Sequence, residues 1–314
     1  MMAEMTRMKC RDDFDRSVTR RRKMTEGYMP YKGFKTWYKI VGEPSEDKTP
    51  VILLHGGPGA CHNYMEPYEA LAERFGRQVI TYDQIGCGKS PIPHQEDDFY
   101  NIQLWVDELD ELRKYLGIKE CYLLGHSWGT ILAMEYILRG KGEGVKGIIL
   151  ASGLCSIDLW LEEADRYVDY LPEDLAEAIK EGNKTGDYSS EKAQEGMALY
   201  YARHVEGPGE EPKCVQESFE GIGECYVVMQ GEAEFVVTGK LKDWDIRDRL
   251  KDINVPTLML SGNDDESTPL MNKTMMDGIP GSKWDLIPHG THMGHCYDPE
   301  PYIQSAEKFM EELD

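Results

Sequence analysis

The sequence contains no apolar run of the roughly 18 residues that a membrane-spanning helix requires, so it predicts no membrane span. No apolar segment follows the basic stretch Arg20-Arg21-Arg22-Lys23, and a secretory signal is therefore not predicted either. With 314 residues and 40% hydrophobic content, the chain is long enough to bury a large core. We expect a cytoplasmic protein built as one large domain, or as one domain that carries an insertion.

Positive charge and paired cysteines are also scarce. Lysine and arginine together number 35 against 57 acidic residues, which gives a formal net charge of −22. This charge repels phosphate backbones and anionic lipid, so we expect neither nucleic acid nor a membrane as a partner, and it favours cationic substrates. The cysteines include no C-x-x-C pair. They are expected to be free buried thiols rather than disulfides or metal ligands.

Short apolar runs alternate with helical patterns from residue 51 onward, which is typical of a mostly parallel sheet flanked by helices, an α/β fold. A hairpin is expected at residues 27–42, around Lys32-Gly33. The predicted strands lie at residues 51–54, 78–82, 121–124, 145–151, 256–261 and 283–287, and the best helices at 101–116, 128–138 and 299–312.

The alternation breaks between about residues 154 and 250, where helical patterns replace the strands. Because the site of such a sheet lies at the carboxyl ends of its strands, a segment inserted after residues 145–151 would cover the site as a cap. The predicted organisation is an N-terminal arm that need not be ordered, an α/β core and a helical cap. These comprise residues 1–27, residues 28–153 with 251–314, and residues 154–250, respectively.

The segment Gly125-His126-Ser127-Trp128-Gly129 follows a predicted strand and precedes a predicted helix. It fits the G-x-S-x-G nucleophile elbow, a strained turn that exposes a serine hydroxyl and tolerates only glycine at its flanks. Ser127 would then lie at a helix N-terminus, where the free N–H groups and the helix dipole favour developing negative charge. The sequence therefore predicts an acyl-enzyme formed on Ser127. An aspartate at this position would have indicated an epoxide hydrolase or a dehalogenase.

A serine nucleophile needs a base and an orienting acid, and in α/β-hydrolases the acid and then the histidine follow the serine in the chain. The acid candidates are Asp264, Asp265 and Glu266, after the strand predicted at 256–261. Three histidines, His289, His292 and His295, follow the last predicted strand and compete for the role of base. Residues alone leave this choice open.

A glycine-rich turn, His55-Gly56-Gly57-Pro58-Gly59, follows the strand predicted at 51–54. Such a turn lets a backbone N–H approach a substrate oxygen closely, as in the HGGG-type turn of lipases. We expect the N–H groups of Gly57 and Trp128 to form the oxyanion hole. The turn is a poor match for a phosphate-binding loop, because it lacks both the G-x-G-x-x-G spacing and a following lysine.

These motifs, taken in order, resemble the proline iminopeptidase family of serine peptidases, and their pattern is closest to that of tricorn-interacting aminopeptidases. The similarity covers about residues 28–314 and implies an α/β-hydrolase fold with a helical cap. It is carried by His55–Gly59, Tyr82-Asp83-Gln84-Ile85-Gly86-Cys87-Gly88-Lys89-Ser90, the elbow, Asp265-Glu266-Ser267-Thr268-Pro269, Glu232-Ala233-Glu234-Phe235 and residues 238–246.

The resemblance implies a role for particular residues. It places the catalytic acid at Asp265 and the base at His292, within Thr291-His292-Met293. It assigns Glu266 and Glu234 to the free amino group of the substrate, and Tyr226 to polarising the scissile carbonyl. An ammonium brought unpaired into a desolvated site would cost roughly several kcal/mol, and nearby carboxylates offset that cost.

The resulting prediction is a serine aminopeptidase that removes an N-terminal residue, proline among the candidates, from short peptides or amino-acid amides with a free N-terminus. The chemistry needs neither a metal nor an organic cofactor. One alternative is an esterase, lactonase or general amidase on the same fold, which would share the triad but would not require the acidic residues. A non-catalytic binding protein is a more remote alternative.

Overall fold

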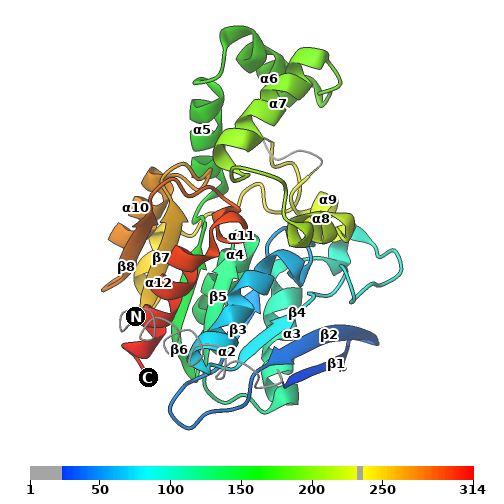
Figure 1. The fold of residues 1–314 in the computed structure, drawn as a ribbon. Coiled ribbons are helices and arrows are strands. Elements are labelled where there is room, and N and C mark those ends of the chain that lie inside the picture. The colour runs from blue at the N-terminus through cyan, green and yellow to red at the C-terminus, as the bar shows by residue number, and fades with distance from the viewer. Residues whose placement is uncertain (1–22, 232–235) are drawn as a thin grey trace, which may run out of the picture.

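The computed structural model describes residues 23–231 and 236–314. An eight-stranded sheet runs through the structure in the order β1-β2-β4-β3-β5-β6-β7-β8 (Figure 1). The pairs β1–β2 and β2–β4 are antiparallel, and all other neighbours are parallel. The strands are β1 (Met24–Tyr31), β2 (Phe34–Val41), β3 (Val51–Leu54), β4 (Val79–Tyr82), β5 (Cys121–His126), β6 (Val145–Ala151), β7 (Thr257–Gly262) and β8 (Lys283–Ile287).

The hairpin β1–β2 begins earlier than the sequence predicts. Lys32 and Gly33 both have positive φ, at 47° and 86°, as a two-residue hairpin turn requires. The register set by this turn pairs Met24 with Val41, so the strand starts three residues before Gly27. Residues 24–27, which the sequence assigns to the N-terminal arm, are therefore part of a strand. They form strand because β2 is long enough to pair with them.

Helices cover both faces of the sheet (Figure 1). Alternate strand residues face opposite sides: Ile52 and Leu123 pack with α3, α4 and α10, whereas Val51 and Leu124 pack with α2 and α12. These helices are α2 (Ala70–Phe75), α3 (Ile102–Leu116), α4 (Trp128–Tyr136), α10 (Pro269–Gly278) and α12 (Pro299–Glu311). The parallel strands and the three helices predicted from periodicity therefore all form, with boundaries shifted by at most a few residues.

Between β6 and β7 the chain leaves the sheet and forms further helices above its carboxyl-terminal edge (Figure 1). The ones that matter here are α5 (Ile157–Val168), α6 (Glu173–Thr185), α7 (Glu191–His204), α8 (Lys213–Glu220) and α9 (Cys225–Met229). α6 and α7 pack together, whereas α8 packs on the 3₁₀ helix η1 (His62–Glu69) of the core. An isolated β-bridge between Ser156 and Asp245 joins the two ends of this helical segment. No helix among the described residues is long and apolar enough to cross a bilayer.

Candidate active site

Ser127 lies in a sharp turn between the end of β5 and the start of α4. Its φ is 54° and its ψ is −122°, a backbone conformation that residues other than glycine rarely adopt. A Cβ added to Gly125 would lie 2.2 Å from the carbonyl oxygen of Gly129, and one added to Gly129 would lie 2.0 Å from the carbonyl oxygen of Leu54. Neither position accepts a larger residue without moving the backbone, so the glycines allow the turn to close.

The loop after β7 carries Asp265, and the loop after β8 carries His292. Nδ1 of His292 lies 3.0 Å from Oδ1 of Asp265, and both side chains are buried. The carboxylate also accepts hydrogen bonds from the Ser152 hydroxyl, 2.6 Å from Oδ2, and from the backbone N–H of Ser267, 2.7 Å from Oδ1. These contacts fix the carboxylate so that it orients the imidazole through Nδ1–H and leaves Nε2 for a substrate-side proton.

The other two candidate histidines are elsewhere. The side chain of His289 is 91% exposed. His295 is buried, its Nε2 lies 3.1 Å from the carbonyl oxygen of Tyr64, and burial lowers its pKa to about 3. Among the three histidines in this stretch, only His292 contacts Asp265.

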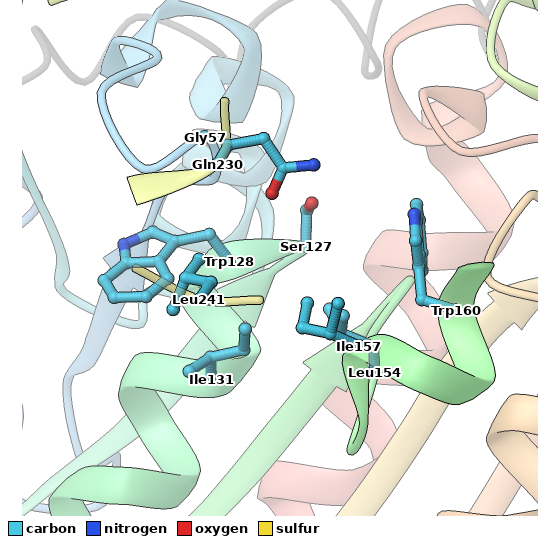
Figure 2. A pocket seen from close by; sticks show the side chains of 9 residues that line it. All are labelled: Gly57, Ser127, Trp128, Ile131, Leu154, Ile157, Trp160, Gln230 and Leu241. Carbon is cyan, nitrogen blue, oxygen red and sulfur yellow. The ribbon is translucent and has the colours of Figure 1, made fainter. Parts of the chain in front are cut away.

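A small pocket opens beside Ser127 (Figure 2). Figure 2 shows the Ser127 hydroxyl directed toward the space between Gln230 and Trp160. His292 adjoins this pocket, because the ring centroids of Trp160 and His292 are 6.0 Å apart. Most of the lining residues have apolar side chains; the lining consists of Gly57, Ser127, Trp128, Ile131, Leu154, Ile157, Trp160, Gln230 and Leu241.

The two expected oxyanion donors, Gly57 and Trp128, line this same pocket as Ser127. Gly57 has a φ of 113°, and a Cβ at this position would lie 2.5 Å from the backbone nitrogen of Gly59. Trp128 is the first residue of α4, where the backbone N–H has no acceptor within the helix. The pocket thus brings one nucleophile candidate together with both donor candidates.

Gln84, in the loop after β4, connects the glycine turn with the elbow. Its side-chain Nε2 donates to the carbonyl oxygen of His55 at 2.8 Å, and its Oε1 accepts from Nε1 of Trp128 at 2.9 Å. Its backbone N–H donates to Nε2 of His55 at 3.0 Å. Sequence reasoning assigned Gln84 no role. The sequence feature that could have indicated a role is its position within the segment Tyr82–Ser90. The residues that it contacts, His55 and Trp128, are distant in the chain.

His126, which precedes the nucleophile, holds the loop that carries His292. Its Nε2 lies 2.9 Å from the carbonyl oxygen of His292, and its Nδ1 lies 3.1 Å from the hydroxyl of Tyr64. Burial keeps the pKa of His126 well below its ordinary value, so the ring is neutral and Nε2–H is its single donor. His126 is thus a buried, hydrogen-bonded residue, and nothing in the sequence around it indicates its link to His292.

Of the three residues that the resemblance assigns to the substrate, the structure describes Glu266 and Tyr226 but not Glu234. Glu266 is buried, and its Oε1 lies 3.7 Å from Nε2 of His292. Tyr226 belongs to α9, whose Cys225 packs against Gly59, but Tyr226 is not among the residues that line the pocket. Glu234 and its neighbour Glu232 lie outside the described residues.

Among the described residues, one trio offers metal-binding atoms close together: His55, Asp83 and Cys87, within 4.8 Å of one another. Each already has protein partners. Oδ1 of Asp83 contacts Nδ1 of His62 at 2.8 Å, Nε2 of His55 accepts from Gln84, and the Cys87 thiol lies 3.2 Å from the carbonyl oxygen of Ala60. These three side chains form hydrogen bonds that hold the turns around the pocket, so the atoms that could bind a metal already have protein partners.

Several known proteins are similar to this chain in both sequence and fold. The family model for the alpha/beta hydrolase fold matches residues 49–205. A proline iminopeptidase of Clostridium botulinum is 44% identical over 294 residues, which is 93% of this chain and 100% of that protein. The crystal structure of a proline iminopeptidase from Mycobacterium smegmatis is 32% identical with a TM-score of 0.86, covering 92% of this chain and 98% of that one. The crystal structure of VinJ is 34% identical, also with a TM-score of 0.86, over 92% and 99%.

Proposed function

The chain belongs to the proline iminopeptidase family of the α/β-hydrolase fold, and on this premise we propose that Ser127, Asp265 and His292 are its catalytic triad. The protein is then a serine aminopeptidase that releases the N-terminal residue of a peptide, with proline as the first candidate. The observation that carries the proposal is that a strained serine lines a small pocket, and a buried Asp–His pair adjoins the same pocket.

In the proposed reaction Nε2 of His292 takes the proton from Ser127 as the serine oxygen attacks the carbonyl of the N-terminal residue. The N–H groups of Gly57 and Trp128 receive the negative charge that develops on the carbonyl oxygen. His292 then protonates the leaving amine, and Asp265 stabilises the imidazolium in between. Water, activated by His292, hydrolyses the acyl-enzyme and releases the amino acid.

We further propose that the substrates are short peptides or amino-acid amides with a free N-terminus. Glu266, beside Nε2 of His292, is well placed to pair with the substrate ammonium, and Glu234 is proposed as a second partner. The side chains of Ile131, Leu154 and Trp160 provide the apolar surface that a proline ring would contact. Tyr226 is proposed to assist at the scissile carbonyl.

The helical segment, residues 154–250, is proposed to act as a cap over this site, since Leu154, Ile157, Trp160, Gln230 and Leu241 line the pocket from above the sheet. We propose that this cap limits the space beyond the first substrate residue, which would favour short peptides. A cytoplasmic location, and the lack of nucleic-acid or membrane partners, remain predictions from composition.

The decisive experiment compares the hydrolysis of prolyl, alanyl and leucyl anilides with that of their N-acetylated forms and a short-chain ester. The Ser127→Ala variant serves as the blank. We expect turnover of the free-amine anilides, fastest for the prolyl compound, and none by the variant. Equal turnover of ester, acetylated and free-amine substrates would instead identify a general esterase or amidase, in which Glu266 has no role in binding.

A further inference from the structure

Away from the pocket, two thiols from separate parts of the chain meet. Cys214 is the second residue of α8 in the helical segment, and Cys296 lies in the short helix α11 (Gly294–Tyr297) of the core. The side chains of Cys214 and Cys296 interact with each other, and both residues are partly exposed and free of disulfide bonds. Both α8 and α11 pack on η1, so the two helices that carry these cysteines rest on the same element of the core.

The pKa values of the two thiols are shifted in opposite directions. The pKa of Cys214 is lowered, first by the thiol of Cys296 and also by the backbone N–H groups of Cys214 and Val215 at the start of α8. The same contact raises the pKa of the Cys296 thiol. The thiolate is the nucleophilic form of cysteine, and a helix N-terminus lowers the pKa of a thiol. This difference favours Cys214 as the attacking thiol and Cys296 as the thiol that resolves the product.

Cys296 is also connected to the active site. Its Sγ–H donates to the carbonyl oxygen of Tyr64 at 3.1 Å, and Nε2 of His295 contacts the same oxygen at 3.1 Å. The hydroxyl of Tyr64 accepts from the N–H of Gly56, in the glycine turn, and contacts Nδ1 of His126. A change at Cys296 therefore acts on η1, which supports both the oxyanion turn and the loop of His292.

We propose that Cys214 and Cys296 form a reversible disulfide that fastens the helical segment to the core. The oxidant is a low-molecular-weight disulfide such as oxidised glutathione. The Cys214 thiolate attacks one sulfur of it and releases one glutathione thiolate; Cys296, after losing its proton to water, attacks the Cys214 sulfur and releases the second. Two protein thiols are oxidised and one glutathione disulfide is reduced to two thiols.

The bond has two consequences. It closes a long loop that includes β7, β8 and Asp265, so it stabilises the folded state, and we expect a Tm increase of about 5 °C. It also removes the S–H donor from the Tyr64 carbonyl and restrains α8 against the core, so turnover falls when the pair is oxidised. The disulfide itself does not depend on the proposed function, whereas the loss of turnover does.

The test incubates the full chain with oxidised glutathione, blocks remaining thiols, and maps peptides without reduction. We expect a cross-linked peptide pair containing Cys214 and Cys296, a higher Tm and lower kcat/KM on prolyl anilide, all reversed by dithiothreitol. Cys214→Ser should abolish all three changes. Cys155→Ser is the matched control, because Cys155 is buried with a pKa raised to about 12, and it should keep them.

A stable glutathione adduct on Cys214 without the cross-link, or a disulfide between other cysteines, would overturn the proposal. An oxidised enzyme that keeps its full kcat/KM would overturn the connection to the active site. If reduced enzyme hydrolyses no anilide at all, the proposed function fails while the peptide map still decides the fate of the disulfide.

Discussion

Replacing Gln84 by methionine should impair catalysis more than substrate binding. Methionine keeps the approximate volume of the side chain but removes its amide, so Nε1 of Trp128 and the carbonyl oxygen of His55 lose their partner. Each buried polar group left unpaired costs about 1–3 kcal/mol, so for these two groups we expect a loss of about 2–6 kcal/mol in the free energy of unfolding.

The catalytic effect follows from geometry. Gln84 joins the two turns that present the N–H groups of Gly57 and Trp128, and a displacement of about 1 Å in such a site costs on the order of 100-fold in rate. Because the proposed role of these donors is to stabilise charge that develops in the transition state, kcat should fall about 10- to 100-fold while KM changes little. The assay is steady-state hydrolysis of prolyl anilide, beside urea denaturation to measure stability.

Two further variants sharpen this test. Trp128→Phe removes the Nε1 donor but keeps the backbone N–H, so its effect and that of Gln84→Met should be strongly non-additive. Gln304→Met is the control, because Gln304 is exposed and contacts only Glu300 among the bonds described for its side chain. If Gln84→Met loses stability but retains kcat, or if the two site variants are simply additive, the idea that Gln84 couples the turns is refuted.

Three other changes have definite expected outcomes. Asp265→Asn should lower kcat by about 10³- to 10⁴-fold with the fold intact, as measured by circular dichroism and initial rates, because the wrong imidazole tautomer is then favoured. Glu266→Gln should reduce kcat/KM for free-amine anilides and leave any slow turnover of N-acetylated ones unchanged; an equal loss on both contradicts ammonium binding. The pKa of Glu108 is raised to about 8 by burial, so the folded state holds a proton that the unfolded state releases above its ordinary value of 4.5. Stability should therefore fall between pH 5 and 8 by up to about 1.4 kcal/mol per pH unit, and denaturation of Glu108→Gln should lack this slope.

The parallel core was predictable because its information is local. Apolar runs such as Val51–Leu54 and Val145–Ala151 form strands with the predicted bounds, and the elbow glycines mark the turn at Ser127 directly. The start of β1 was not predictable in this way, since Met24 becomes strand only through its pairing with Val41.

The supporting residues of the site were hidden for the same reason. Gln84 and His126 have unremarkable neighbours in the chain, and their roles arise from hydrogen bonds to Trp128, His55 and His292, which the fold brings from distant loops. The choice of His292 over His289 and His295 came from the resemblance to a family. In the structure the three histidines differ in burial and in hydrogen-bond partner, and neither property can be predicted from their spacing in the sequence.

The bridge between Ser156 and Asp245 means that the chain departs from the sheet and returns to it at nearly the same point. A stretch with adjoining ends can be exchanged for another without altering the strands on either side. The proposed nucleophile, acid and base lie outside that stretch, whereas much of the pocket wall lies within it. The proposed reaction chemistry and the proposed substrate contacts thus lie in separable segments of the chain. A chimera that carries the helices of a relative should change its preferred substrate and still form an acyl-enzyme.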